Sequence, residues 1–168
     1  MAVTTNYGSR IMTGLLNSTT ITLADPGEGG GRPRVWHETV ETAAADSATS
    51  TYWMATLPSN ARIHGSSVID HDALGATTAT LAVGVYNTSS RTDITNSTTA
   101  LNTGIVASTA GRKALIADRA NYGKRLWEYT AATADPKCDL AVKVSIEGSV
   151  HLSSGAGTIN LEIYYSVD

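Results

Sequence analysis

The sequence predicts an all-β fold: a single-domain antiparallel β-sandwich or jelly roll with an extended N-terminal arm. Three observations predict it. Apolar and polar residues alternate with a period of two, helical periodicity is almost absent, and Gly, Pro, Asn and Ser interrupt the chain at short intervals. A chain of 168 residues is of ordinary size for one domain, and no internal repeat or long linker divides it. We expect the arm at residues 1–18 and the sandwich at residues 19–168.

The first 18 residues are polar and irregular apart from Ile11, Met12, Leu15 and Leu16. A segment with so little apolar surface favours an arm that becomes ordered on a partner. We expect Ile11, Leu15 and Leu16 to anchor the arm there.

A glycine-rich stretch follows at residues 27–34 and ends with Arg32 and Arg34. Glycines let backbone amides approach an anion, but no Lys-Ser or Lys-Thr follows, and the dinucleotide pattern lacks its last glycine. The residues after Asp25 and Pro26 are therefore predicted to form a surface loop. We expect Arg32 and Arg34 to make polar contacts with an acidic patch on a partner protein.

Five strands are predicted in the first half of the chain, at residues 20–23, 35–42, 51–57, 62–69 and 77–86. Pro58 ends the third because proline has no amide hydrogen to give to a sheet. Ile63 and Val68 fall out of phase within the fourth, which indicates a bulge near Gly65.

The second half begins with residues 87–113, which are rich in Asn, Thr, Ser and Gly and are interpreted as a surface loop, with a short helix suggested at 113–120. Strict alternation then predicts strands at 140–147 and 159–167. Turn residues separate them, so we expect the two to pair as an antiparallel hairpin, with room for a short strand at 150–152.

Composition argues against several classes of function. The formal net charge is −3, so the chain lacks the excess of Lys and Arg that nucleic-acid binding needs. The single cysteine, Cys138, excludes an internal disulfide framework and is expected to be a half-buried apolar residue. No cleavable signal sequence or apolar run of 18 residues is present, so we expect neither export by this route nor a membrane span.

No motif predicts a reaction, a metal site or a cofactor. Asp70, His71 and Asp72, with His64 nearby, offer metal-ligand atoms, but neighbouring strand residues point to opposite faces, which favours a polar turn. No Gly-x-Ser-x-Gly elbow occurs. Three tryptophans and seven tyrosines offer a stacking platform for sugars, yet a chain without phenylalanine is expected to use them as core volume.

One part of the chain resembles a known class of protein. Residues 52–63, followed by Gly75 and residues 77–86, resemble small virion structural proteins of tailed double-stranded-DNA bacteriophages. The second half agrees through residues 126–128, 134–136, the strand at 139–146 and the ending at 159–168. The resemblance covers residues 50–168 in outline and leaves the first 49 aside.

This resemblance implies a non-enzymatic component of the phage particle, and we expect a capsid decoration or cement protein. It would bind the major capsid protein on the outer surface of the virion and form a homo-oligomer, such as a trimer, after synthesis in the cytoplasm of the bacterial host. The alternative is a fibre-type domain that binds a carbohydrate or receptor. Neither of these predicted functions involves nucleic acid, a membrane or a cofactor.

Overall fold

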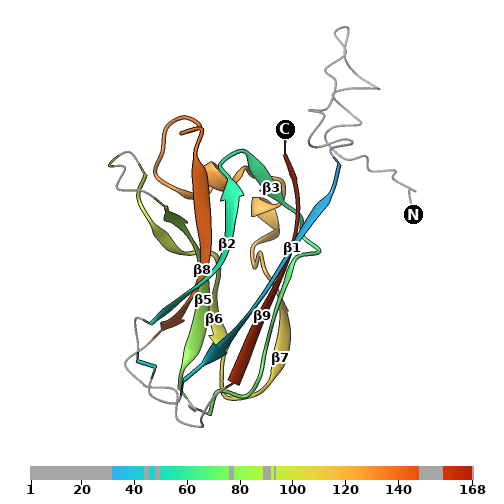
Figure 1. Cartoon of the computed structure of the whole chain (residues 1–168), viewed down its shortest axis with the longest axis vertical. Coiled ribbons are helices and arrows are strands. Elements are labelled where there is room, and N and C mark those ends of the chain that lie inside the picture. Colours follow the sequence, from blue (N-terminus) through green and yellow to red (C-terminus); the bar gives the residue numbers. More distant parts are fainter. Residues whose placement is uncertain are drawn as a thin grey trace, which may run out of the picture.

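A computed structural model describes residues 32–43, 46–47, 50–75, 78–88, 92, 94–147 and 157–167. It confirms the predicted fold class, because two antiparallel sheets pack face to face as a sandwich (Figure 1). The arm at 1–18, with Ile11, Leu15 and Leu16, lies outside the described residues, as do the strands expected at 20–23 and 150–152. The domain boundary at residue 18 therefore stays a prediction.

The first sheet is built around β9 (Gly157–Val167), and we call it the β9 sheet. Its strand order is β1-β9-β4-β7, and β3 also pairs with β9. Its other strands are β1 (Arg34–Thr42), β3 (Ala61–Ile63), β4 (Val68–His71) and β7 (Gly111–Ala114). β9 is thus the central strand, with β1 along one side and β3 and β4 along the other.

The second sheet, the β8 sheet, has the order β2-β8-β5-β6. Its strands are β2 (Thr51–Pro58), β8 (Asp139–Glu147), β5 (Thr80–Asn87) and β6 (Ser97–Val106). β5 and β8 pair in regular register, whereas β6 is irregular against β5. Val83 faces Asn102 and Val85 faces Ser97, so a bulge in β6 lies opposite Gly84.

The core lies between the two sheets and follows the alternation of the sequence. In β9, Ile159, Leu161 and Ile163 are fully buried, and in β8 Leu140, Val142 and Val144 face them from the opposite sheet. The polar residues between them point outward, as a period of two requires. The sheets also meet at one edge, where the Trp36 indole of β1 donates to the Met54 carbonyl of β2 at 2.9 Å.

Two short 3-10 helices connect β7 to β8. They are η2 (Arg119–Asn121) and η3 (Leu126–Tyr129), and they pack beside β3 at the end of the sandwich where β1 begins and β9 ends (Figure 1). The Arg62 guanidinium donates to the Gly123 carbonyl and ties this connection to β3. The Tyr129 hydroxyl donates to the Asn121 carbonyl at 2.8 Å, and burial raises the pKa of Tyr129 to about 12.

The predicted hairpin of the last two strands is wrong. Residues 139–147 form β8 and residues 157–167 form β9, but β8 pairs with β2 and β5 while β9 lies in the other sheet. Both strands carry the same alternation because each has one face on the shared core. That pattern identifies a half-buried strand and does not identify its partner.

Three other expectations also need correction. The single strand expected at 62–69 is two strands, β3 and β4, joined by a turn at Gly65 where the Tyr122 ring lies against the backbone. The loop expected at 87–113 contains β6 and most of β7. The helix suggested at 113–120 is instead the end of β7 followed by η2, because Leu115 and Ile116 continue into the core.

Candidate interaction surfaces

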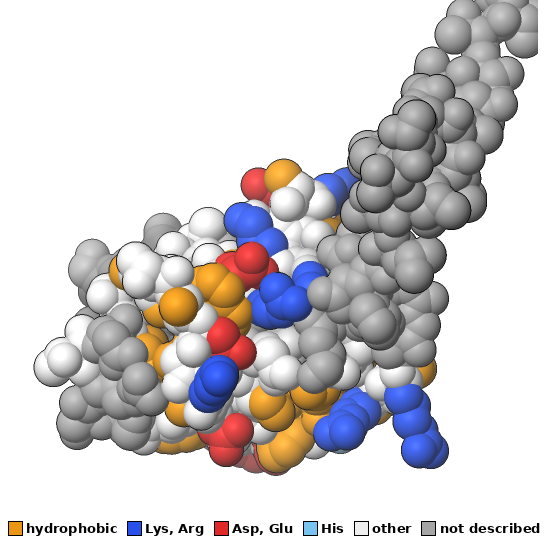
Figure 2. Space-filling model, turned by 90° about the horizontal axis from the view of Figure 1, so that it is seen from above, with side chains coloured by type: hydrophobic (Ala, Val, Ile, Leu, Met, Phe, Trp, Pro, Cys, Tyr) orange, Lys and Arg blue, Asp and Glu red, His pale blue; other side chains and the backbone are white. Residues whose placement is uncertain are grey.

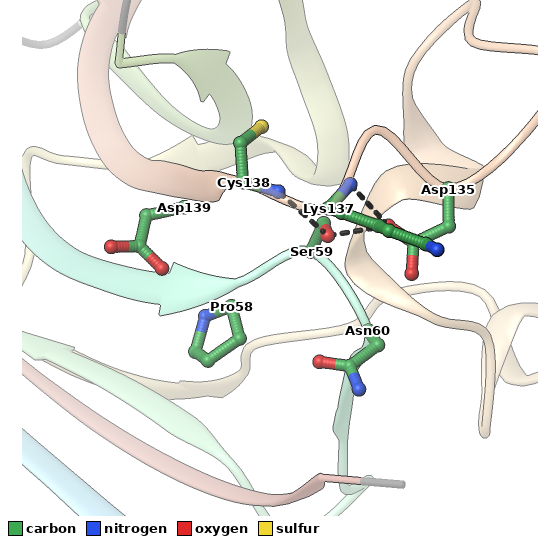
Figure 3. Close-up of a pocket in the computed structure, with 7 residues that line it drawn as sticks. All are labelled: Pro58, Ser59, Asn60, Asp135, Lys137, Cys138 and Asp139. Atoms are coloured by element: carbon green, nitrogen blue, oxygen red, sulfur yellow. Dashed lines mark hydrogen bonds between the residues drawn. The ribbon is translucent and has the colours of Figure 1, made fainter.

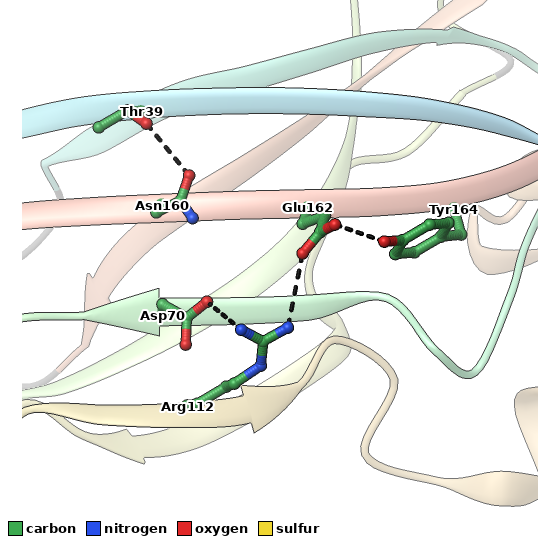
Figure 4. Close-up of polar contacts among 6 residues, drawn as sticks. All are labelled: Thr39, Asp70, Arg112, Asn160, Glu162 and Tyr164. Carbon is green, nitrogen blue, oxygen red and sulfur yellow. Dashed lines mark hydrogen bonds and ion pairs between the residues drawn. The ribbon is translucent and has the colours of Figure 1, made fainter.

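The outer face of the β9 sheet carries polar side chains that form hydrogen bonds and ion pairs with one another (Figure 4). Arg112 reaches Asp70 at 3.3 Å and Glu162 at 3.5 Å. The Tyr164 hydroxyl donates to Glu162, and this bond raises the pKa of Tyr164. Exposed ion pairs of this kind contribute little stability.

The outer face of the β8 sheet presents an exposed tryptophan. Trp53 of β2 is 52% exposed, and its indole N–H donates to the Thr56 hydroxyl at 2.9 Å. The Lys143 ammonium of β8 lies 4.5 Å from the centre of the Trp53 ring and 5.0 Å from that of Tyr86. These cation–π contacts hold the rings in place. The prediction that aromatic residues supply core volume holds for Trp36 and Trp127 and is wrong for Trp53.

A hollow of about 370 Å³ lies where β2 turns into β3 beside the start of β8 (Figure 3). Its polar atoms bond to one another: Ser59 donates to Asp135, the Lys137 amide donates to Asp135 at 2.9 Å, and the Cys138 amide reaches Ser59 at 3.3 Å. Lys137 has a φ of 50°, a left-handed conformation that turns the chain into β8. Cys138 is half-buried against the core, as predicted.

Asp70, His71 and Asp72 do not form the predicted polar turn. Asp70 and His71 are the last two residues of β4, with Asp70 on the outer face and His71 only 5% exposed. The Asp72 carboxylate accepts the Thr158 amide at 3.0 Å. Asp70 and His71 thus lie on opposite faces of β4, as strand geometry predicted, although all three residues line one small hollow beside Gly111. Among the described residues, no group of three or more His, Cys, Asp or Glu side chains is placed to hold a metal ion.

One histidine lies within hydrogen-bond reach of a serine. His64 Nε2 is 3.3 Å from Ser166 Oγ, and Ser166 is almost completely buried. Neither residue lines the hollow at Ser59 or the smaller one beside His71. The arrangement ties β9 to the turn after β3 and offers no exposed nucleophile.

The predicted partner-binding arginines lie where β1 begins. Arg34 is the first residue of β1, Arg32 is two residues before it, and both side chains are exposed. Lys143 was not among the predicted site residues, although the alternation of residues 140–147 places it on the outer face of its strand. Its position between Trp53 and Tyr86 depends on which strands flank β8, which alternation leaves open.

A hydrogen bond between Asp46 and Tyr52 makes stability depend on pH. The Tyr52 hydroxyl and the Ala43 amide both donate to the Asp46 carboxylate, which lowers the pKa of Asp46 below its ordinary 3.8. A lowered pKa stabilises the fold above about pH 3.8, and this stabilisation disappears as the pH falls through the lower value.

We expect Tyr52→Phe to destabilise the protein at pH 7, and this effect to shrink as the pH falls below about 3.8 and through the lower pKa of Asp46 in the folded protein. Thermal melts of both proteins across this pH range measure the difference. A difference that stays constant down to the lowest pH would contradict the role of Asp46.

Comparison with known proteins gives matches among solved structures only. No protein-family model and no curated protein matches the sequence. The chain is similar to a chain in the capsid of Ralstonia phage GP4, with a TM-score of 0.61 and 18% identity over 89% of this chain and 92% of that chain. This similarity shows a shared fold.

Two further matches are weaker. A chain in the capsid asymmetric unit of cyanophage Pam1 has a TM-score of 0.48 and 21% identity, covering 90% of this chain and 97% of that one. A chain in the capsid of Helicobacter pylori bacteriophage KHP30 has a TM-score of 0.39 and 13% identity, covering 81% of this chain and 92% of that one.

The described ranges contain no helix with the length and apolar character needed to cross a bilayer.

Proposed function

We propose that this protein is a non-enzymatic structural component of a phage particle and that it decorates and stabilises the capsid. One observation carries the proposal: the chain shares its fold with a chain in a phage capsid, and the match extends over nearly the full length of both. The described residues are consistent with it, because no group of three or more His, Cys, Asp or Glu side chains among them is placed to hold a metal ion.

The proposed mechanism is mass action. A protein that binds the assembled shell, and not the separate subunits, stabilises the shell by its binding free energy at every site. We propose the major capsid protein as the partner, on the outer surface of the head. Because shell sites repeat by symmetry, we also propose that the protein acts as a homo-oligomer, with a trimer as the form expected on local three-fold axes.

Cryo-EM of purified particles of the phage that encodes this chain tests the proposal. We expect density for the sandwich on the outside of the head, repeated with the symmetry of the shell. Density confined to the tail or fibres, or the absence of the chain from the particle, would overturn it. The first of these results would favour the alternative, a fibre domain that binds a carbohydrate or receptor.

That alternative has one observation in its favour, the exposed Trp53 ring, because sugars stack on such rings. The Lys143 ammonium already lies 4.5 Å from the centre of this ring. A glycan array probed with the full chain and with Trp53→Ala distinguishes the two functions, and a hit that Trp53→Ala removes would support the alternative.

The arm provides a further test of capsid binding. Deleting residues 1–18 removes Ile11, Leu15 and Leu16, which we expect to anchor the protein on the shell or on a neighbouring copy. We expect weaker binding to heads and a nearly unchanged melting temperature of the free domain, measured by co-sedimentation and by calorimetry. A large drop in melting temperature would show that the arm belongs to the core of the domain.

A further inference from the structure

Basic side chains are concentrated at one end of the sandwich. β1 begins at this end, and β3, the two 3-10 helices and the turn before β8 pack there. We call it the basic end, and Figure 2 looks down on it. It carries most of the Lys and Arg residues that the structure describes: Arg32, Arg34, Arg62, Arg119, Lys124, Arg125 and Lys137.

Four described carboxylates lie at this end, Asp118, Glu128, Asp135 and Asp139, and three of them accept backbone amides. Asp118 accepts the Ala120 amide at 2.9 Å, Glu128 accepts the Arg125 amide, and Asp135 accepts the Lys137 amide. Among the described carboxylates, none forms an ion pair with the five exposed cations of this end: Arg32, Arg34, Arg119, Lys124 and Lys137. Within the described part of the chain, this positive charge is therefore not balanced by paired acids.

The rest of the described domain has the opposite sign. Away from the basic end, only Arg112, Lys113 and Lys143 are basic, and Arg112 is paired with two acids. The carboxylates there outnumber them: Glu38, Glu41, Asp46, Asp70, Asp72, Glu147 and Glu162. The domain is thus electrically polarised along its length, and such a charge distribution orients a protein as it approaches a charged surface.

The start of the described chain lies at the same end. Arg32 leads into β1 there, so the 31 residues that precede it join the sandwich at the basic end. The chain that contains the expected arm is therefore attached to the sandwich at the end that carries the unbalanced positive charge.

We infer that the basic end is the surface with which this domain meets the capsid, and that its partner there is an acidic protein surface. The inference rests on the proposed function and adds the orientation and the partner's chemistry. Arg and Tyr are enriched in protein interfaces, and Tyr122, 43% exposed, lies among these arginines. Nucleic acid is disfavoured, because carboxylates lie between the cations and the whole chain has a net charge of −3.

Single charge reversals test the inference. Arg34→Glu, Arg119→Glu and Lys137→Glu change exposed residues at the basic end, and Lys113→Glu on β7 is the matched control with the same type of charge reversal elsewhere. Association with heads purified from a phage that lacks this gene is measured at low and high salt. Melts of each variant confirm that it is folded.

Each basic-end variant is expected to slow association by about three- to tenfold at low salt and to weaken its salt dependence, because exposed interface charges act mainly on the association rate. Lys113→Glu should stay within about twofold of the wild type. Equal effects of all four variants, or none, would overturn the inference while leaving the proposed function intact.

The same experiment distinguishes a failure of the proposed function from binding of nucleic acid by the basic end. If the wild-type protein does not bind the heads, the proposed function fails. If duplex DNA at physiological salt retains the wild type and not the basic-end variants, the end binds nucleic acid and the inference is overturned.

Discussion

Leu161→Ala is expected to lower the free energy of unfolding by about 2–5 kcal/mol. Leu161 is fully buried in β9, where it lies between Glu38 of β1 and Ile69 of β4. The shortened side chain loses apolar burial and leaves a cavity between the sheets, and the close-packed strands on both sides limit relaxation. Urea denaturation followed by fluorescence measures the change.

Val106→Ala is the control for Leu161→Ala. Val106 is also an apolar strand residue, but it is 51% exposed on β6. We expect its replacement to change the unfolding free energy by less than about 0.5 kcal/mol. If the two substitutions cost the same, β9 would not occupy the centre of the core.

Gly84→Ala is expected to destabilise the protein by about 1–3 kcal/mol, although it adds only one methyl group. Gly84 lies in β5, opposite the bulge of β6. An added Cβ would sit 2.5 Å from the Thr98 carbonyl group and against the Ser97 carbonyl oxygen. Both neighbours are backbone atoms, so the change cannot be absorbed by a side-chain rotation and β6 has to move.

The matched control is Gly111→Ala in β7. There the nearest atom to an added Cβ is His71 Nε2 at 3.7 Å, an ordinary contact distance. Losing the flexibility of glycine in the unfolded chain should make this variant neutral or more stable, by up to about 1 kcal/mol. Thermal melts compare the two variants, and a Gly84→Ala protein as stable as Gly111→Ala would show that β6 does not cover Gly84.

Local patterns in the sequence were sufficient to predict individual strands. Alternation gave β9 and β8, and the predicted ranges at 35–42, 51–57 and 77–86 correspond to β1, β2 and β5. Pro58 ends β2, as its missing amide hydrogen predicts. These features depend on neighbouring residues in the chain, and so they can be read without knowing the partners.

The features that were not predicted depend on distant residues. β6 is rich in Thr and pairs irregularly, so it buries only a few apolar side chains, such as Leu101 and Ile105, and lacks a clean alternation. The turn at Gly65 depends on the Tyr122 ring, which is far away in sequence.

The candidate site was predicted only in part. Arg32 and Arg34 are exposed, as expected of partner-binding residues, but their contacts remain a prediction. The other cations of the basic end come from segments that only the fold brings together. Neither composition nor a net charge of −3 indicates such a local excess.

The position of β9 has a consequence for biosynthesis. This strand leaves the ribosome after every strand that it pairs with, and Thr39 of β1 bonds to Asn160 across 121 positions of sequence. Bringing such distant segments together lowers the entropy of the chain before the stabilising contacts between them can form, and this slows folding. Among the described strands, β1 pairs only with β9 in its sheet. Until β9 is translated, β1 therefore lacks this partner, and during that interval the nascent chain is most exposed to aggregation and to cellular proteases.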